Sequence, residues 1–365
     1  MGRKAKVVAL PIACQCAHVS TRRSTIDDVA QAAGVARVTV SRVLNNEQNV
    51  RPETREKVRK AVETLGYSVN HQARALASGA GRTILLIHSH DPEREPNSYY
   101  HSGLELGALR ACSALGFDLV TRAVDPAGAD RVRLLASIVE RERPVGIVLP
   151  PPLSDDIPLL QAMKRAGVRA VAISAGERGR AVVPSSGMDE RAGGRAIGEY
   201  LASLGHRRIG FVKGPRDHLA AALRYDGFLD ALRCAGIGDE PWIVTGDFTF
   251  KSGVEGGEKL LREGAGITVL ACANDDMAAG AMLALHRAGV AIPNDMSVTG
   301  FDDTPMSEIV WPPLTTIRQP IKDIAERAVH MLVENQIEEE PCYEALRHEL
   351  VVRESTAAPA QRSAA

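Results

Sequence analysis

The sequence predicts an α/β protein with two lobes built on parallel sheets, preceded by a small all-α head. Between residues 82 and 355, short apolar strands alternate with segments of helical periodicity, which is typical of parallel sheets covered by helices on both faces. Residues 24–69 instead show only helical patterns. The 365 residues are enough for this head and for a body of two similar lobes.

The head begins with two short predicted helices that are joined by a turn at Gly34. Thr25 is a good N-cap, Asp28 favours the positive end of the first helix, and Gly34 can end that helix in a left-handed conformation. Apolar residues at helical spacing form the inner faces: Ile26, Val29, Ala30, Ala33, Val40, Val43 and Leu44. The outer face of the second helix carries Arg37, Val38, Ser41 and Arg42. A short helix with basic and hydroxyl residues on its outer face is typical of helix-turn-helix motifs that enter a DNA major groove.

A third helix is expected from about Pro52 to Leu65, and it closes the small core of the head through Val58, Ala61, Val62 and Leu65. Residues 70–78 have helical propensity but little apolar face, and glycines at 79 and 81 mark a flexible joint. We therefore expect a hinge helix and linker over residues 70–81 and the two-lobed domain over residues 82–355.

Charge and cysteine usage limit the class of protein. Residues 1–80 contain 13 Lys/Arg and 6 Asp/Glu, a net charge of +7, whereas the remainder carries −8. A basic head on an acidic body suits a head that meets phosphate. The six cysteines are too scattered for a disulfide framework and suit a reducing cytoplasm. Cys14 and Cys16 lack a second ligand pair, so no metal site is expected.

Both ends of the chain are expected to be disordered. Residues 1–23 loosely imitate a signal peptide, but their apolar run is short and is interrupted by Pro11 and Gln15. Residues 356–365 have the composition of a disordered tail. No apolar stretch reaches the length of a transmembrane helix, and a cytoplasmic location is expected.

In the body, the expected strands are 83–88, 118–122, 145–149, 169–173, 208–212, 242–245, 268–272 and 297–300. Helical patterns lie between them, for example at 103–115, 130–142, 189–204 and 276–289.

Several motifs indicate a family. The string Thr-Val-Ser-Arg-Val-Leu-Asn at 39–45 resembles a signature of the DNA-binding head of the lactose-repressor family (LacI/GalR type). Four fragments of the body resemble its sugar-responsive members: residues 224–228, 246–248, 274–278 and 300–303. The resemblance covers residues 25 to about 355 and implies a periplasmic-binding-protein-like core. It also implies that residues 311–316 form a crossover between the lobes.

The resemblance implies that Arg37 and Val38 read bases, with Arg42 one helical turn further on. Arginine can donate two hydrogen bonds to guanine, and valine can pack on a thymine methyl group. Arg37 and Arg42 contacting only phosphates remains an alternative. Further implied DNA contacts come from Thr25, Thr39, Ser41, Asn45, Asn70, Arg74 and Leu76, the last as a minor-groove wedge. One departure is Ala36, which stands where the family usually has a capping serine.

The resemblance also implies an effector site. Arg224, Asn274 and Asp302 are expected to grip sugar hydroxyls, and Phe248 is expected to stack on the ring. Tyr99, Tyr100 and Ser154 are expected to line the first lobe's side, because loops at the carboxyl ends of parallel strands form ligand sites. Asp275 is also open to a role in a turn, and Asp303 to one as a helix cap.

These residues predict a ligand-responsive repressor of carbohydrate-utilisation genes. It would bind a near-palindromic operator as a homodimer, without a cofactor, and leave the operator when a sugar closes the cleft. Two alternatives remain: a corepressor-dependent regulator with a purine or sugar-phosphate effector, and a sugar-binding module that does not read DNA. An enzyme is not expected, because the sequence has no Gly-rich phosphate loop, nucleophile elbow or metal-binding histidine pair.

Overall fold

The computed structural model describes residues 26–44, 50–65, 82–90, 98–264, 266–333 and 342–360. The chain divides into two compact units, Met1–Gly79 and Ala80–Ala365. Among the described helices, none combines the length and the apolar composition needed to cross a membrane.

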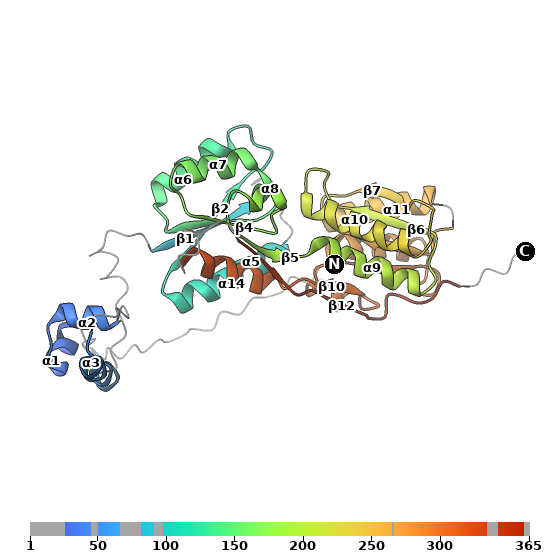
Figure 1. Cartoon of the computed structure of the whole chain (residues 1–365). Helices are drawn as coiled ribbons and strands as arrows, with labels where there is room; N and C mark the ends of the chain where they lie inside the picture. Colours follow the sequence, from blue (N-terminus) through green and yellow to red (C-terminus); the bar gives the residue numbers. More distant parts are fainter. Residues whose placement is uncertain are drawn as a thin grey trace, which may run out of the picture. The chain divides into compact units, whose positions relative to one another are not determined.

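The first unit is the predicted helical head, with α1 (Ile26–Ala33), α2 (Arg37–Leu44) and α3 (Pro52–Thr64) (Figure 1). Gly34 ends α1 with a φ of +63° and donates to the Gln31 carbonyl. The buried core consists of Val29, Ala30, Val40, Val43, Val58 and Ala61. The side chains of Ile26 and Leu44 lie outside the described part of the head.

The second unit contains two lobes. The sheet of the first lobe has the order β11-β5-β4-β3-β1-β2, and every neighbouring pair is parallel. Its strands are β1 (Thr83–Ser89), β2 (Asp118–Val124), β3 (Gly146–Leu149), β4 (Ala170–Ile173), β5 (Ser185–Met188) and β11 (Tyr343–Leu346). Its helices are α5 (Ser98–Leu115), α6 (Arg131–Glu142), η1 (Leu153–Asp155), α7 (Ile157–Arg165), α8 (Glu177–Arg180) and α14 (Ile321–Val333).

Alternation along β1 explains how this sheet is covered on both faces. Ile84 and Leu86 join the core under α5 and α14, whereas Leu85 and Ile87 join the core under α6 and α7. Because both faces are buried, the strand reads as a continuous apolar run rather than as an alternating pattern.

The second lobe has a parallel sheet of order β7-β6-β8-β9. Its strands are β6 (Ile209–Lys213), β7 (Trp242–Thr245), β8 (Val269–Cys272) and β9 (Ser297–Thr299). Its helices are α9 (Glu190–Ser203), α10 (Leu219–Cys234), α11 (Phe250–Glu263), α12 (Asp275–Arg287) and α13 (Met306–Ile309). Helix α9 packs on α10 and α11 on α12, and β10 (Thr316–Arg318) pairs with β12 (Glu349–Val351) in antiparallel fashion. The predicted fold class is confirmed, including all eight expected strands.

The chain crosses between the lobes after β5, after β10 and after β11 (Figure 1). The expectation that residues 311–316 form a crossover is wrong in detail. Thr316 already belongs to β10 in the second lobe, Trp311 is 83% exposed, and the crossing follows Arg318.

The expectation of a disordered tail from Thr356 is wrong for the first residues of that tail. Thr356 Oγ1 lies 2.9 Å from Tyr200 Oη, and Ala357 N donates to Ser297 Oγ at 3.0 Å. His206 Nε2 also donates to the Ala357 carbonyl at 2.9 Å. These bonds hold the segment after β12 against the second lobe. Residues 361–365 and 1–23 lie outside the described residues.

Candidate functional site

The exposed face of α2 is the candidate DNA-reading surface. Val40 and Val43 are buried in the core of the head, whereas Arg37 and Arg42 are exposed. Val38 is 60% exposed, so its methyl groups are accessible on this surface. Thr39 is half-buried.

The start of α2 has no side-chain cap. The Ala36 carbonyl accepts from Thr39 N at 2.8 Å and from Val40 N at 3.2 Å, which places Ala36 at the N-cap position. The other predicted DNA contacts lie outside the description: the side chain of Ser41, and Thr25, Asn45, Asn70, Arg74 and Leu76 entirely.

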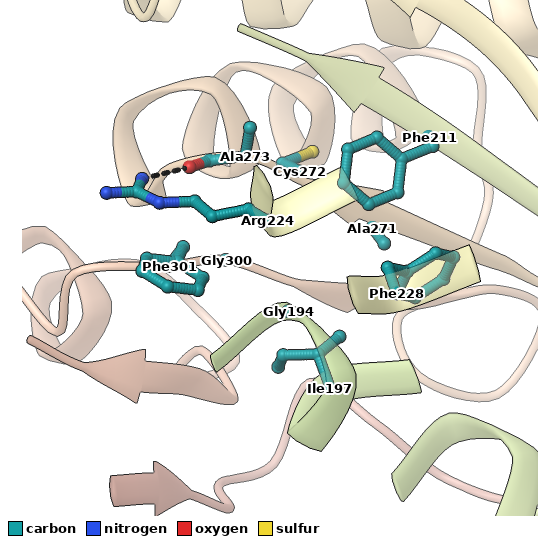
Figure 2. Close-up of a pocket in the computed structure, with 10 residues that line it drawn as sticks. All are labelled: Gly194, Ile197, Phe211, Arg224, Phe228, Ala271, Cys272, Ala273, Gly300 and Phe301. Carbon is teal, nitrogen blue, oxygen red and sulfur yellow. Dashed lines mark hydrogen bonds between the residues drawn. The ribbon is translucent and has the colours of Figure 1, made fainter. Parts of the chain in front are cut away.

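In the body, a buried arginine organises the candidate effector site. Arg224 Nε donates to Glu190 Oε2 at 2.7 Å. Figure 2 shows the second bond, from Nη1 to the Ala273 carbonyl at 2.9 Å. Its Nη2 donates to Gln319 Oε1 at 3.1 Å, and Nη1 lies 3.5 Å from Asp302 Oδ1. The guanidinium is thus held in one orientation by α9, β8 and the crossover after β10.

Two carboxylate oxygens beside Arg224 are left without donors. Glu190 Oε1 and Asp302 Oδ1 are buried and have no hydrogen-bond partner among the residues described. Burial raises the pKa of Asp302 well above its usual range, although the charge of Arg224 opposes this shift. Buried acceptors that lack donors within the protein are suited to a ligand that supplies hydroxyl groups.

Phe248 is held at the edge of the same lobe. Its backbone is left-handed, with a φ of +68°, and its carbonyl accepts from Asn274 Nδ2 at 3.0 Å. Asn274 Oδ1 also caps α12 by accepting from Met277 N at 2.9 Å. Asn274 therefore positions Phe248, which reduces the hydrogen-bonding capacity that it was expected to offer a sugar. His218 lies edge-on to Phe248 with ring centroids 4.9 Å apart, and burial lowers the pKa of His218 to about 3.

The first lobe contributes Tyr100 to this cluster. Burial raises the pKa of the Tyr100 hydroxyl above its usual range, and the negative charges of Glu190 and Asp302 raise it further. These interactions bring Tyr100 from α5 into the electrostatic field of the Arg224 cluster. Tyr99 is half-buried, and none of the described contacts joins it to Arg224.

Two serines of the first lobe lie at the carboxyl ends of its strands. Ser154, which was predicted, and Ser174, which was not, both have buried hydroxyls without a partner in the described ranges. Ser174 follows β4 with a φ of +48°. Phe248 and Asp302 also have a positive φ, and each of these three residues lies in a loop that follows a strand. Strained backbone of this kind is a feature of ligand-binding loops.

The two remaining acidic candidates are structural. Asp275 accepts from Thr304 N at 2.7 Å and from Thr316 Oγ1 at 2.7 Å, while burial raises its pKa to about 7. Asp303 accepts from Ser307 Oγ at 2.9 Å and from Arg318 Nε at 2.8 Å. Burial alone would raise the pKa of Asp303, but these donors and Arg353 hold it below its usual range.

A cavity of about 10 Å³ lies behind Arg224 in the second lobe (Figure 2). The guanidinium carbon lies 3.9 Å from the centre of the Phe301 ring, and the other walls include Phe211 and Phe228. This space is large enough for one water molecule at most, so it cannot hold a sugar. Within the described ranges, no group of three His, Cys, Asp or Glu residues could hold a metal ion.

Sequence reasoning missed Glu190, Gln319, Ser174 and His218. Glu190 and Gln319 lie just after β5 and β10. These strands are short and have no apolar run, so the sequence does not show that a strand ends beside either residue. His218 immediately precedes a helix, and Ser174 follows an expected strand directly. Ser174 could have been found by listing polar residues after every expected strand.

Known proteins match both units. A family model described as bacterial regulatory proteins, lacI family, matches residues 25–70, and a periplasmic binding protein-like domain matches residues 199–356. The HTH-type transcriptional regulator CelR of Thermobifida fusca is 35% identical over 92% of this chain and 98% of its own length. Catabolite control protein A of Priestia megaterium is 31% identical over 91% of this chain and 99% of its own length.

Solved structures are also similar to this chain. A CelR–cellobiose complex has a TM-score of 0.68 and 32% identity, covering 91% of this chain and all of that one. The lac repressor dimer bound to operator and the anti-inducer ONPF has a TM-score of 0.69 and 30% identity, covering 92% of this chain and all of that one. The curated relatives are named as regulatory proteins, which confirms that an enzyme was rightly excluded. The chain belongs to the lacI family of bacterial regulatory proteins.

Proposed function

We propose that this regulator is a repressor that binds a near-palindromic operator as a homodimer in the cytoplasm and responds to a neutral carbohydrate. The observation that carries the choice of effector is the Arg224 cluster. It combines a fixed guanidinium fork with two donor-free carboxylate oxygens, on Glu190 and Asp302. A sugar hydroxyl can donate to such an oxygen and accept from the fork at the same time.

The charge of the cluster argues against phosphorylated effectors. Glu190 and Asp302 place two carboxyl groups beside one guanidinium, and three of the five N–H groups of Arg224 already donate within the protein. The negative charge of Asp276 also acts on Asp302 and adds to the negative field. These carboxyl groups would repel a phosphate group, and the guanidinium of Arg224 is already paired with two of them.

The names of two relatives support a carbohydrate. CelR was solved with cellobiose, and another lacI-family regulator, from Enterococcus faecium, was solved with bound ribose. The lac repressor dimer was solved bound to its operator and to the anti-inducer ONPF. Lobe closure around a sugar would favour one of two states of the dimer, and the operator would favour the other.

The test is selection of DNA by the purified full-length chain from a random pool, followed by binding to the selected duplex with a panel of sugars. We expect a near-palindrome whose affinity falls when one neutral sugar is added. Tightening by a ligand would replace the inducible repressor with the corepressor alternative. A chain that binds a sugar but selects no sequence would instead be a sugar-binding module.

Leu76 is part of this proposal as the minor-groove wedge, although it lies outside the described residues. Leu76→Ala is expected to weaken binding to the selected duplex far more than binding to unrelated DNA. Equal losses on both duplexes would reject the wedge.

A further inference from the structure

The reading end of α2 has an unusual charge arrangement. Arg37 is the first residue of the helix, the first turn contains no acidic residue, and Ala36 offers no side-chain cap. A cation at the positive end of a helix is electrostatically unfavourable. The position of Arg37 therefore does not serve the stability of α2.

In the described part of the head, the acidic residue that pairs with Arg37 comes from the other helix of the motif. Asp27 Oδ2, in the first turn of α1, lies 3.7 Å from Arg37 Nη1. Both side chains are 65% exposed, and an ion pair so open to water contributes little to folding. When DNA covers the outer face of α2, water leaves and the same pair becomes stronger.

We propose that Asp27 is a specificity-determining residue of the head, which positions Arg37 to read guanine instead of a phosphate. A carboxylate on the Nη1 side leaves Nη2 and Nε as the free edge of the guanidinium, which can donate to guanine O6 and N7. The carboxylate also repels phosphate, and it can accept from a cytosine amino group in the groove. This inference rests on the proposed reading of DNA by Arg37.

Loss of Asp27 should therefore have opposite effects on sequence-specific binding and on binding to unrelated DNA. A freed Arg37 can swing to the nearest phosphate, which carries no sequence information. The preference for guanine then falls, while affinity for unrelated DNA rises and depends more steeply on salt. A head that merely unfolds would lose both kinds of binding.

The experiment uses the full-length chain and begins with sequence selection by the wild type. Arg37→Ala identifies the G·C pair that Arg37 reads, and the readout is the affinity ratio between the selected duplex and one with that pair replaced by A·T. We expect a ratio of about tenfold or more for the wild type. Asp27→Asn should lower it at least about threefold while binding to an unrelated duplex tightens. Asp27→Glu should restore most of the ratio.

Two controls separate positioning from stability. Glu53→Gln removes a carboxylate from the first turn of α3, so it makes the same charge change at an equivalent helix position away from Arg37. It should leave the ratio unchanged. In the Arg37→Ala background, Asp27→Asn should change the ratio no further.

An unchanged ratio in Asp27→Asn would overturn the inference while leaving Arg37 as a reader. The inference would also be overturned if Asp27→Asn lowered both kinds of binding together with the melting temperature. A wild type that selects no sequence would reject the proposed reading of DNA itself.

Discussion

At the residue scale, Arg224 shows how one side chain can organise contributions from distant parts of the chain. Its partners come from the start of α9, the end of β8 and the crossover after β10. An arginine provides this because its planar fork donates in several fixed directions, whereas a lysine ammonium provides a single point of charge.

Arg224→Lys tests this role. The charge that balances Glu190 and Asp302 remains, but the fork is lost, so we expect effector affinity to fall at least about tenfold. The free energy of unfolding should fall by about 1–3 kcal/mol because buried acceptors lose donors. Calorimetric titration and thermal melting measure the two effects. Arg191→Lys, at the exposed pair with Asp230, is the matched control and should change neither.

If a folded Arg224→Lys variant bound the effector with wild-type affinity, Arg224 would not belong to the binding site.

His206 gives a pH dependence whose sign can be worked out. Burial lowers its pKa below the ordinary value of 6.5, although its bond to the Ala357 carbonyl opposes the shift. The unfolded chain therefore takes up a proton before the folded chain does. The contribution of neutral His206 is complete above pH 6.5 and is lost as the pH falls toward the folded-state pKa.

We expect the free energy of unfolding of the wild type to fall relative to that of His206→Gln between about pH 6.5 and pH 5. Comparison with this variant cancels the opposite contribution of Asp275 and Asp302, whose raised pKa values favour the folded state at low pH. His286→Gln, on the exposed side of α12, is the control and should follow the wild type. Parallel curves for the wild type and His206→Gln would contradict the assignment.

At the element scale, the strands that the sequence predicted are those with apolar runs. Strand β5 reads Ser-Ser-Gly-Met and contains no such run, yet it is buried between β4 and β11. Its pairing is non-local, because β11 lies more than 150 residues further along the chain. Gly187 is required there, since a Cβ would come within 2.9 Å of the Ser174 backbone. No local pattern in the sequence encodes such a strand.

The uncapped start of α2 gives a prediction for the head. Ala36→Ser supplies a hydroxyl that can accept from the first turn of the helix, so the head should gain about 1 kcal/mol. Thermal melting, or hydrogen exchange of the α2 amides, measures the gain. Ala32→Ser is the control, because the same exchange inside exposed α1 should cost about 0.5 kcal/mol. No gain in Ala36→Ser would show that the N-cap position is satisfied in another way.

At the scale of the whole second unit, the two lobes touch at Gly176 and Leu219. Gly176 lies between β4 and α8 in the first lobe, and Leu219 begins α10 in the second. A Cβ at Gly176 would lie 2.2 Å from Leu219 Cδ2, so the two lobes are in direct contact there. The backbone of Gly176 has a φ of −72°, which alanine adopts without strain.

Gly176→Ala should therefore hinder the approach of the lobes without disturbing either one. We expect effector affinity to fall about tenfold while the melting temperature changes little. Leu219→Ala in the same chain should restore the affinity, because it removes the clashing methyl group. Unchanged affinity in Gly176→Ala would mean that binding does not require this contact.

The residues of the site, like the strands, could be predicted from the sequence only where a local pattern marks them. Arg224, Phe248 and Asp302 stand in motifs that resemble a known family, so they could be named from the sequence. Glu190 could not, because its role depends on the packing of α9 against α10 and on the register of β5. That information exists only when segments far apart in the chain have come together.

The order in which the lobes alternate along the chain has a consequence for synthesis on the ribosome. The sheet of the first lobe is completed by β11, and one of its faces is covered by α14, but both emerge after β6–β10 of the second lobe. A nascent chain that ends before Ile321 would leave Ile84, Leu86 and Val148 without their covering helix. The helical head, in contrast, has its whole core within its first 65 residues. The cell therefore makes a DNA-reading module well before the sensor that is to control it, and the unfinished sensor is the part that needs protection from aggregation.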